Sequence, residues 1–223
     1  MKKIEGDTFQ KILGSIPQRK EELRSSLHVL IQVCHAVEFA HSLGILHRDL
    51  KPENIMVGAF NQVYLMDWGL AVDMNNPQKA RRGLAGTPAY MAPEMLKGDP
   101  KILIMATDVY LLGTILHEIL VGEFRHKGNS VRESLASVKQ SNSYDFGDDV
   151  PRELAELCNQ SCAKESSERP QTVLEFRERL ESFFEYWEVY KFVEQGYKDF
   201  RQYKRIWKEE KRNIDINYPL LLQ

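Results

Sequence analysis

A charged run at residues 47–54, His-Arg-Asp-Leu-Lys-Pro-Glu-Asn, constrains the fold of this chain more than any other feature. Two shorter signals follow it along the chain, Asp-Trp-Gly at 67–69 and Ala-Pro-Glu at 92–94. A carboxylate, an ammonium and an amide, followed by a second carboxylate, in this order and at these spacings leave little room for a chance match. We therefore expect a fold that brings the first two signals to one place.

The residues between these two signals predict how they meet. Residues 55–57 and 63–66 are apolar enough to form two short strands, joined through the turn-forming segment 58–62. A hairpin of this kind carries Asn54 and Asp67 to the same end. The sequence therefore predicts that both side chains face one site.

Taken together, the three signals resemble the catalytic half of a eukaryotic-type protein kinase, most similar to the bacterial Ser/Thr kinases of that family. The resemblance covers residues 1–184 and implies an α+β fold, mostly α: a kinase large lobe with a small catalytic β hairpin. It implies transfer of the γ-phosphate of ATP to Ser or Thr hydroxyls of a protein substrate, with Mg²⁺ as the metal. Residues 185–223 lie beyond the resemblance and form a separate tail.

The resemblance assigns roles to individual residues. Asp49 would accept the proton of the substrate hydroxyl, and Lys51 would place its ammonium near the γ-phosphate. Thr87 would bond both of them, and Lys51 with Thr87 is typical of the Ser/Thr class. Asn54 and Asp67 would hold Mg²⁺, a hard cation that prefers oxygen ligands.

Other positions complete the implied nucleotide site. Glu53 is expected to belong to it, and Met56 would form the floor under the adenine ring. Asp7 or Thr8 would approach the ribose. None of these roles follows from spacing alone, because each depends on the family resemblance.

The resemblance also implies structural contacts around the site. Asp108 would anchor the backbone of the catalytic loop from the start of a buried helix. Glu94 would pair with Arg169, and the ring of His47 would pack against Trp68. His47 is not expected to act as a catalytic base.

One departure concerns the segment between Asp67 and Thr87. Residues 69–86 contain no Ser, Thr or Tyr. Arg48, which in many kinases grips a phosphorylated loop, therefore has no phospho-partner there, although Asp73 offers a fixed negative charge. We expect activity that does not depend on phosphorylation of this loop.

The second departure lies upstream of the charged run. Only 48 residues precede Asp49, and none forms the Gly-rich loop or strand lysine of the family's small lobe. Residues 1–8 resemble the hinge between the lobes, which predicts an N-terminally truncated kinase domain. The alternative function is a catalytically silent binding or regulatory module, whose exposed cleft surface would promote self-association.

Composition excludes several other classes. A net charge of −2 argues against a nucleic-acid partner, and no apolar run approaches the ~20 residues of a membrane span. The three cysteines suit a reducing compartment and predict a cytoplasmic protein. Cys158 and Cys162 are interpreted as core residues rather than metal ligands. The expected partners are the two that the resemblance implies, a protein substrate and a nucleotide.

Apolar periodicity places the helices. Residues 24–43 carry an apolar stripe and end at Gly44, and residues 106–121 are apolar nearly all round, which predicts a buried central helix. Pro151 and Pro170 are expected to open two further helices, running to about residues 163 and 184. The remaining histidines are interpreted as surface or capping residues: His28, His35, His41, His117 and His126.

Aromatic and basic residues alternate through the tail, residues 185–223. This pattern is typical of an amphipathic helix that packs back on the lobe. It also fits a helix that binds a partner or lies beside a membrane. The sequence leaves both alternatives open.

Overall fold

The computed structural model of the chain describes residues 6–15, 20–147 and 150–217. The chain divides into two compact units, residues 1–181 and residues 182–223. The first contains all the residues of the candidate site. The second contains the end of one helix and the long helix that follows it.

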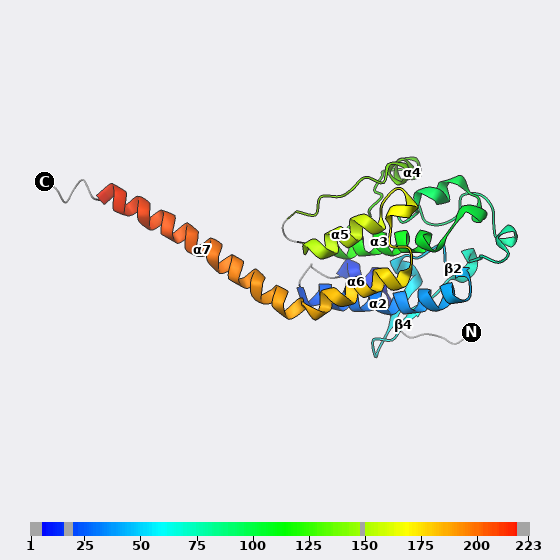
Figure 1. The fold of residues 1–223 in the computed structure, drawn as a ribbon, viewed down its shortest axis with the longest axis horizontal. Helices are drawn as coiled ribbons and strands as arrows, with labels where there is room; N and C mark the ends of the chain where they lie inside the picture. The colour runs from blue at the N-terminus through cyan, green and yellow to red at the C-terminus, as the bar shows by residue number, and fades with distance from the viewer. Residues whose placement is uncertain (1–5, 16–19, 148–149, 218–223) are drawn as a thin grey trace. The chain divides into compact units, whose positions relative to one another are not determined.

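A buried helix, α3 (Met105–Val121), forms the centre of the first unit. Every residue from Ala106 to Leu120 is buried, which confirms the prediction made from the apolar run. Helices α2 (Lys20–Ser42) and α5 (Arg152–Ser161) pack against it (Figure 1). Because a burial of this extent leaves no face to solvent, α3 provides a fixed frame for whatever is attached to it.

The approach of α5 to α3 depends on Gly113. A Cβ added there would lie 2.7 Å from the Cβ of Ser161 and 2.9 Å from Sγ of Cys162. Cys158 and Cys162 are both buried and point their sulfur atoms at α3 carbonyl oxygens, those of Gly113 and Tyr110. Both cysteines therefore act as core residues.

The predicted helix over 24–43 is observed as α2, which begins a few residues earlier. Its apolar stripe is buried, and the chain leaves the helix through Gly44, whose φ is +74°. Glycine adopts this left-handed conformation without the Cβ strain of other residues, which explains the stop at that position. The stripe consists of Leu27, Leu30, Ile31, Cys34, Val37 and Ala40.

The predicted hairpin is confirmed as β3 (Ile55–Gly58) and β4 (Val63–Leu65), which pair antiparallel with Ile55 opposite Leu65. Strand β1 (Gly6–Thr8) adds to β3, so the sheet has the order β1-β3-β4. The short helix α1 (Phe9–Ser15) follows β1. A second, two-stranded sheet pairs β2 (Ile45–Leu46) with β5 (Val72–Asp73). The part of the expected hinge at residues 1–5 lies outside the described residues.

Two helices begin at side-chain caps that the sequence analysis overlooked. Helix α4 (Val131–Gln140) was not predicted; its N-cap Ser130 accepts a hydrogen bond from the backbone of Glu133 at 3.2 Å. The expectation that Pro170 opens a helix is wrong, because α6 (Val173–Glu185) starts three residues later. There Thr172 Oγ1 accepts from the backbone of Glu175 at 3.2 Å, so a hydroxyl cap sets the start.

Short 3-10 helices connect the larger elements. They are η1 (Pro52–Asn54), η2 (Trp68–Leu70), η3 (Pro77–Lys79), η4 (Pro93–Lys97), η5 (Pro100–Ile102) and η6 (Ser166–Glu168). Four of the six begin with proline, which fixes the φ value that a first helical turn needs and lacks the N–H that would go unbonded there.

The assignment of His117 and His126 to the surface is wrong. Both rings are buried, and burial lowers the pKa of each to about 3. His126 bonds the hydroxyl of Tyr110 at 2.7 Å, and His117 stacks edge-on against Tyr144. A histidine has both an apolar ring and polar tips, so sequence alone does not decide whether it lies in the core.

The second unit is dominated by one long helix, α7 (Trp187–Asn217). Near its start the ring of Trp187 meets Phe183 edge-on, with ring centroids 5.4 Å apart. Across the described residues, no helix combines the length and apolar character that crossing a membrane requires. Both predictions for the tail, packing on the lobe or binding a partner, stay predictions.

Candidate active site

One buried carboxylate positions the backbone of the charged run. Asp108, in the first turn of α3, accepts hydrogen bonds from the backbone nitrogens of His47 at 2.8 Å and Arg48 at 2.9 Å. Its Oδ2 also meets Nε2 of His41 at 2.8 Å. The predicted anchoring contact is confirmed, and it ties this loop to the centre of the core.

Three side chains form a bonded triangle at the candidate site. Thr87 Oγ1 donates to Oδ1 of Asp49 at 3.0 Å and accepts from Nζ of Lys51 at 2.8 Å. Lys51 Nζ lies 3.3 Å from the other carboxylate oxygen of Asp49. The structure therefore brings together a carboxylate, an ammonium and a hydroxyl from segments 36 or more residues apart in the chain.

The amide of Asn54 completes this cluster. Its nitrogen donates to the backbone oxygen of Asp49 at 2.8 Å and to Oδ2 at 3.2 Å. With the nitrogen used in this way, the orientation of the amide is fixed and Oδ1 remains as the acceptor for a ligand. Asn54 is buried, so its orientation is held by the loop rather than by solvent.

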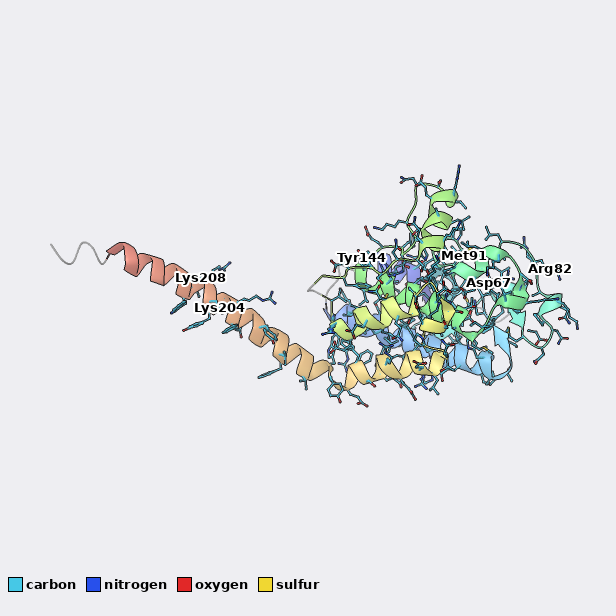
Figure 2. The ribbon with its side chains drawn as sticks, turned by 45° about the horizontal axis from the view of Figure 1, so that its top comes forward. Asp67, Arg82, Met91, Tyr144, Lys204 and Lys208 are labelled. Carbon is cyan, nitrogen blue, oxygen red and sulfur yellow. The ribbon has the colours of Figure 1, made fainter. Side chains whose placement is uncertain are left out.

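Asp67 is placed beside Asn54 by the hairpin. The backbone nitrogen of Met66, one residue earlier, donates to the carbonyl oxygen of Asn54 at 2.8 Å. Asp67 is exposed and adopts a left-handed φ of +60°, with Oδ1 accepting from Gly69 at 3.3 Å (Figure 2). A carboxylate and an amide oxygen are the donor types that fit Mg²⁺.

The ring of His47 packs beside this pair of segments. It meets Trp68 edge-on with centroids 4.5 Å apart, which confirms the predicted contact, and its Nε2 lies 3.0 Å from the Met66 carbonyl oxygen. Burial lowers the pKa of His47. The ring is therefore neutral near pH 7 and joins the charged run to the segment that carries Asp67.

Met56 and Glu53 lie outside the bonded cluster. Met56 occupies the middle strand of the sheet, between Thr8 on one side and Tyr64 on the other. Glu53 is exposed, and its charge contributes to raising the pKa of Glu118. The structure thus places Met56 beside β1, while the charge of Glu53 acts on the group of residues around Glu118.

That group was missed by the sequence analysis. Tyr90 donates its hydroxyl to Glu118 at 2.6 Å, and the amide of Gln10 donates to the other oxygen of Glu118 at 2.8 Å. Burial is the main cause of the raised pKa of Glu118. The available signal was Glu118, a carboxylate within the largely apolar helix α3, because a buried carboxylate requires buried partners.

A buried ion pair holds the Ala-Pro-Glu segment at residues 92–94. Arg169 donates from Nη1 to Oε1 of Glu94 at 2.7 Å and from Nη2 to Oε2 at 2.9 Å, as predicted. Burial acts to raise the pKa of Glu94, but the bonds and charge of Arg169 outweigh it and the pKa is lowered. The pair fixes the Ala-Pro-Glu segment against the core.

An open pocket of about 840 Å³ begins at Thr87. Pro88, Phe124 and Val131 give it apolar walls, and Glu133 adds a carboxylate. Thr87 belongs both to the lining of this pocket and to the bonded cluster, because its hydroxyl also bonds Asp49. A peptide that reached Asp49 would have neighbouring side chains at this pocket.

The geometry agrees with the comparisons to known proteins. The chain matches the family described as protein kinase domain over residues 2–181. The chain belongs to the protein kinase family, as the fold and the ordered signals predicted.

Among its relatives are serine/threonine-protein kinases called PknD. The protein from Protochlamydia amoebophila (strain UWE25) is 30% identical over 215 residues, covering 82% of this chain and 22% of the relative. That from Chlamydia pneumoniae is 31% identical over 211 residues, covering 80% and 22%. That from Chlamydia trachomatis serovar D is 30% identical over 223 residues, covering 82% and 23%. The chain thus spans less than a quarter of the length of these curated relatives.

Proposed function

We propose that the chain acts as a protein serine/threonine kinase. The observation that carries the proposal is the triangle of Asp49, Lys51 and Thr87, in which one hydroxyl joins a carboxylate and an ammonium. The kinase family membership and the printed names of the relatives support the same activity. Phosphoryl transfer needs this kind of positioned charge more than it needs covalent chemistry.

Each residue of the cluster has a separate role in this proposal. Asp49 orients the acceptor hydroxyl and takes its proton, because its carboxylate is held by Thr87 and Asn54. Lys51 offsets the negative charge that develops on the transferred group. Thr87 bonds both charged groups and so fixes their relative positions, and it borders the pocket for the substrate.

Nucleotide and metal are assigned to the edge of the hairpin. Asn54 and Asp67 present the oxygen donors that would hold Mg²⁺, and the ion would offset negative charge on the phosphates of ATP. Met56, on the middle strand, is assigned to the adenine ring, and Glu53 to the rim of the same site. Their support is the resemblance to kinases and the register that places Met56 beside Thr8.

The domain division and the environment complete the proposal. Residues 1–184 form the kinase domain and residues 185–223 a helical tail that is open to a partner or to self-association. A cytoplasmic location is supported by the three cysteines, which are free thiols. The alternative, a catalytically silent binding module, makes different predictions in the experiment below.

The test is phosphoryl transfer from labelled ATP by the 223-residue chain to peptide mixtures that contain Ser, Thr or Tyr. We expect Mg²⁺-dependent labelling of Ser and Thr peptides. Asp49→Asn should reduce the rate by about 10²–10⁴-fold, the contribution typical of a general base. Asp145→Asn, the same change in an exposed loop, should leave the rate as it is.

Three outcomes separate the alternatives. Saturable Mg·ATP binding without transfer would favour the silent module. Equal rates for the wild type and Asp49→Asn would remove Asp49 from the mechanism. Labelling confined to Tyr peptides would contradict the Ser/Thr assignment while leaving the kinase fold unaffected.

A further inference from the structure

The loop between Asp67 and Thr87 has an unusual composition for a segment that reaches an active site. Residues 69–86 contain no Ser, Thr or Tyr, so no side chain there can accept a phosphate ester. The loop nevertheless ends at Thr87, whose hydroxyl bonds both Asp49 and Lys51. Some other interaction has to hold it in place.

Arg48 makes that interaction. Its side chain is 1% exposed, and its guanidinium donates from Nη1 to the carbonyl oxygen of Arg81 at 2.9 Å and from Nη2 to that of Gly83 at 3.3 Å. The backbone nitrogen of Gly83 donates in turn to the carbonyl oxygen of Gly98 at 2.8 Å. The loop is therefore held from two sides at residue 83.

The loop returns to Arg48 at a third point, immediately before Thr87. Gly86 has a φ of +118°, and a Cβ added there would lie 3.4 Å from the carbonyl oxygen of Arg48 and 2.8 Å from Cε of Met95. Arg48 itself is fixed at its backbone nitrogen by Asp108 of α3. A continuous series of contacts thus runs from the core through Arg48 to the residue next to Thr87.

A buried guanidinium usually pairs with a carboxylate, but Arg48 bonds carbonyl oxygens instead. Within the described part of the chain, Arg48 pairs with no Asp or Glu side chain. Asp73, the candidate from the sequence, accepts instead from Asn75 at 2.9 Å and Asn76 at 2.8 Å. Burial lowers the pKa of Arg48, and the charge of Arg81 adds to this effect, so the two carbonyl oxygens are its compensation.

We propose that Arg48 is a positioning residue that pins residues 81–83 through their carbonyl oxygens and so orders the loop to Thr87 without any phosphate on it. The inference rests on the proposed function, because it concerns the regulation of the same site. It makes the site independent of loop phosphorylation. The planar fork of arginine suits this task, since its two terminal nitrogens reach two separate oxygens at once.

The test measures hydrogen exchange of the peptide that covers residues 80–86 in the unmodified 223-residue chain. The outward position of Arg82 at the edge of the unit leaves the segment open to solvent, so protection there has to come from backbone contacts (Figure 2). We expect the amides of this peptide to be protected from exchange in a sample of the chain that intact mass shows to carry no phosphate. Arg48→Lys keeps the charge but provides one nitrogen, and should accelerate exchange by about tenfold or more.

Local and global effects are separated by two controls. Peptides from α3 should exchange at the wild-type rate in Arg48→Lys, which shows that the core is intact. Arg152→Lys makes the same substitution at an exposed residue paired with Glu156, and should leave the loop unchanged. If Arg48→Lys fails to fold, Arg48→Gln, whose amide also provides a single donor nitrogen, is measured in its place.

Exchange at the rate of an unstructured peptide in the unphosphorylated wild type would overturn the proposal. An equal loop rate in the wild type and a folded Arg48→Lys variant would also overturn it. The readout does not need catalysis: a protected loop in a chain that transfers no phosphate would uphold the inference and contradict the proposed function. Phosphoryl transfer by a chain whose loop exchanges like an unstructured peptide would do the reverse.

Discussion

The ion pair between Arg169 and Glu94 gives the sharpest stability prediction. The Arg169 side chain is 0% exposed and that of Glu94 is 14% exposed. Arg169→Ala removes both charged hydrogen bonds and leaves the Glu94 carboxylate with two neutral donors, the hydroxyl of Thr107 at 2.8 Å and the backbone of Glu94 itself. Breaking one member of a buried pair costs about 3–5 kcal/mol, so we expect that loss of unfolding free energy at pH 7.

Several neutral groups share the same guanidinium, which supports the upper part of this range. Their carbonyl oxygens lose a donor in Arg169→Ala, and the loss adds most to the cost where the contact is buried, as it is at Ala106. The ring of Tyr110, 4.8 Å below the guanidinium, also loses its cation. The carbonyl oxygens are those of Ala163 at 2.8 Å, Lys164 at 3.0 Å and Ala106 at 3.2 Å.

The pH dependence of this cost tests its origin. In the wild type Glu94 has a lowered pKa, so its contribution is complete above about pH 4.3, the ordinary glutamate value, and is lost as pH falls through the lowered value. In Arg169→Ala burial is no longer outweighed, and the pKa of Glu94 rises. Protonation then relieves the buried charge, so the deficit relative to the wild type should shrink as pH falls from 7 towards 4.

The assay is urea unfolding followed by far-ultraviolet circular dichroism at both pH values. Arg152→Ala removes an exposed arginine from a surface pair and should change stability by no more than about 1 kcal/mol. The double variant Arg169→Met, Glu94→Leu should lose less than Arg169→Ala, because no charge is stranded. A loss below about 1 kcal/mol at pH 7, or a deficit that grows in acid, would refute the reasoning.

Three further predictions follow from contacts in the core and the site. The free energy of unfolding should decrease as pH falls from about 6.5, the ordinary histidine pKa, to about 3, because His117 and His126 bind protons in the unfolded chain but stay neutral when buried. Denaturant titrations measure this, and a flat pH profile would contradict it. Gly113→Ala should destabilise the chain, since its Cβ would lie 2.7 Å from Ser161, whereas Gly14→Ala, with open space around it, should be neutral or stabilising in thermal unfolding. Thr87→Val should lower phosphoryl transfer while Thr87→Ser retains it, as measured by initial rates; equal rates would remove the hydroxyl bridge from the mechanism.

The apolar segments were predictable because a buried element needs apolar residues on each face that it buries. Helix α3 is apolar nearly all round, so a buried position was the expected interpretation. The β3–β4 hairpin was equally predictable, since its two apolar runs flank turn residues. From it followed the meeting of Asn54 with the segment that carries Asp67.

Helix α4 escaped prediction because its signal is chemical rather than periodic. Only Val138 of this helix is buried, so no apolar stripe marks it. The cap Ser130 with Glu133 three residues later was the available sign. At α6 the same kind of cap, Thr172, outweighs the nearby Pro170, whose fixed φ is compatible with a helix start but does not require one.

The polar networks were predictable only where the family resemblance named them. Glu94 and Arg169 lie 75 residues apart, and nothing local in the sequence pairs them. The family resemblance assigned no role to Tyr90, Gln10 or Glu118, so the group that they form was missed. Contacts of this range depend on how whole elements pack, which local patterns do not encode.

The anchoring of the charged run to Asp108 has a consequence for heat sensitivity. Because the loop is attached to a helix that is enclosed on all sides, its position cannot shift unless the interior itself rearranges. A screen for alleles that fail only at elevated temperature should therefore recover small substitutions within α3, at positions that touch no reacting group. Inactivation and melting of the first unit should then occur over the same few degrees.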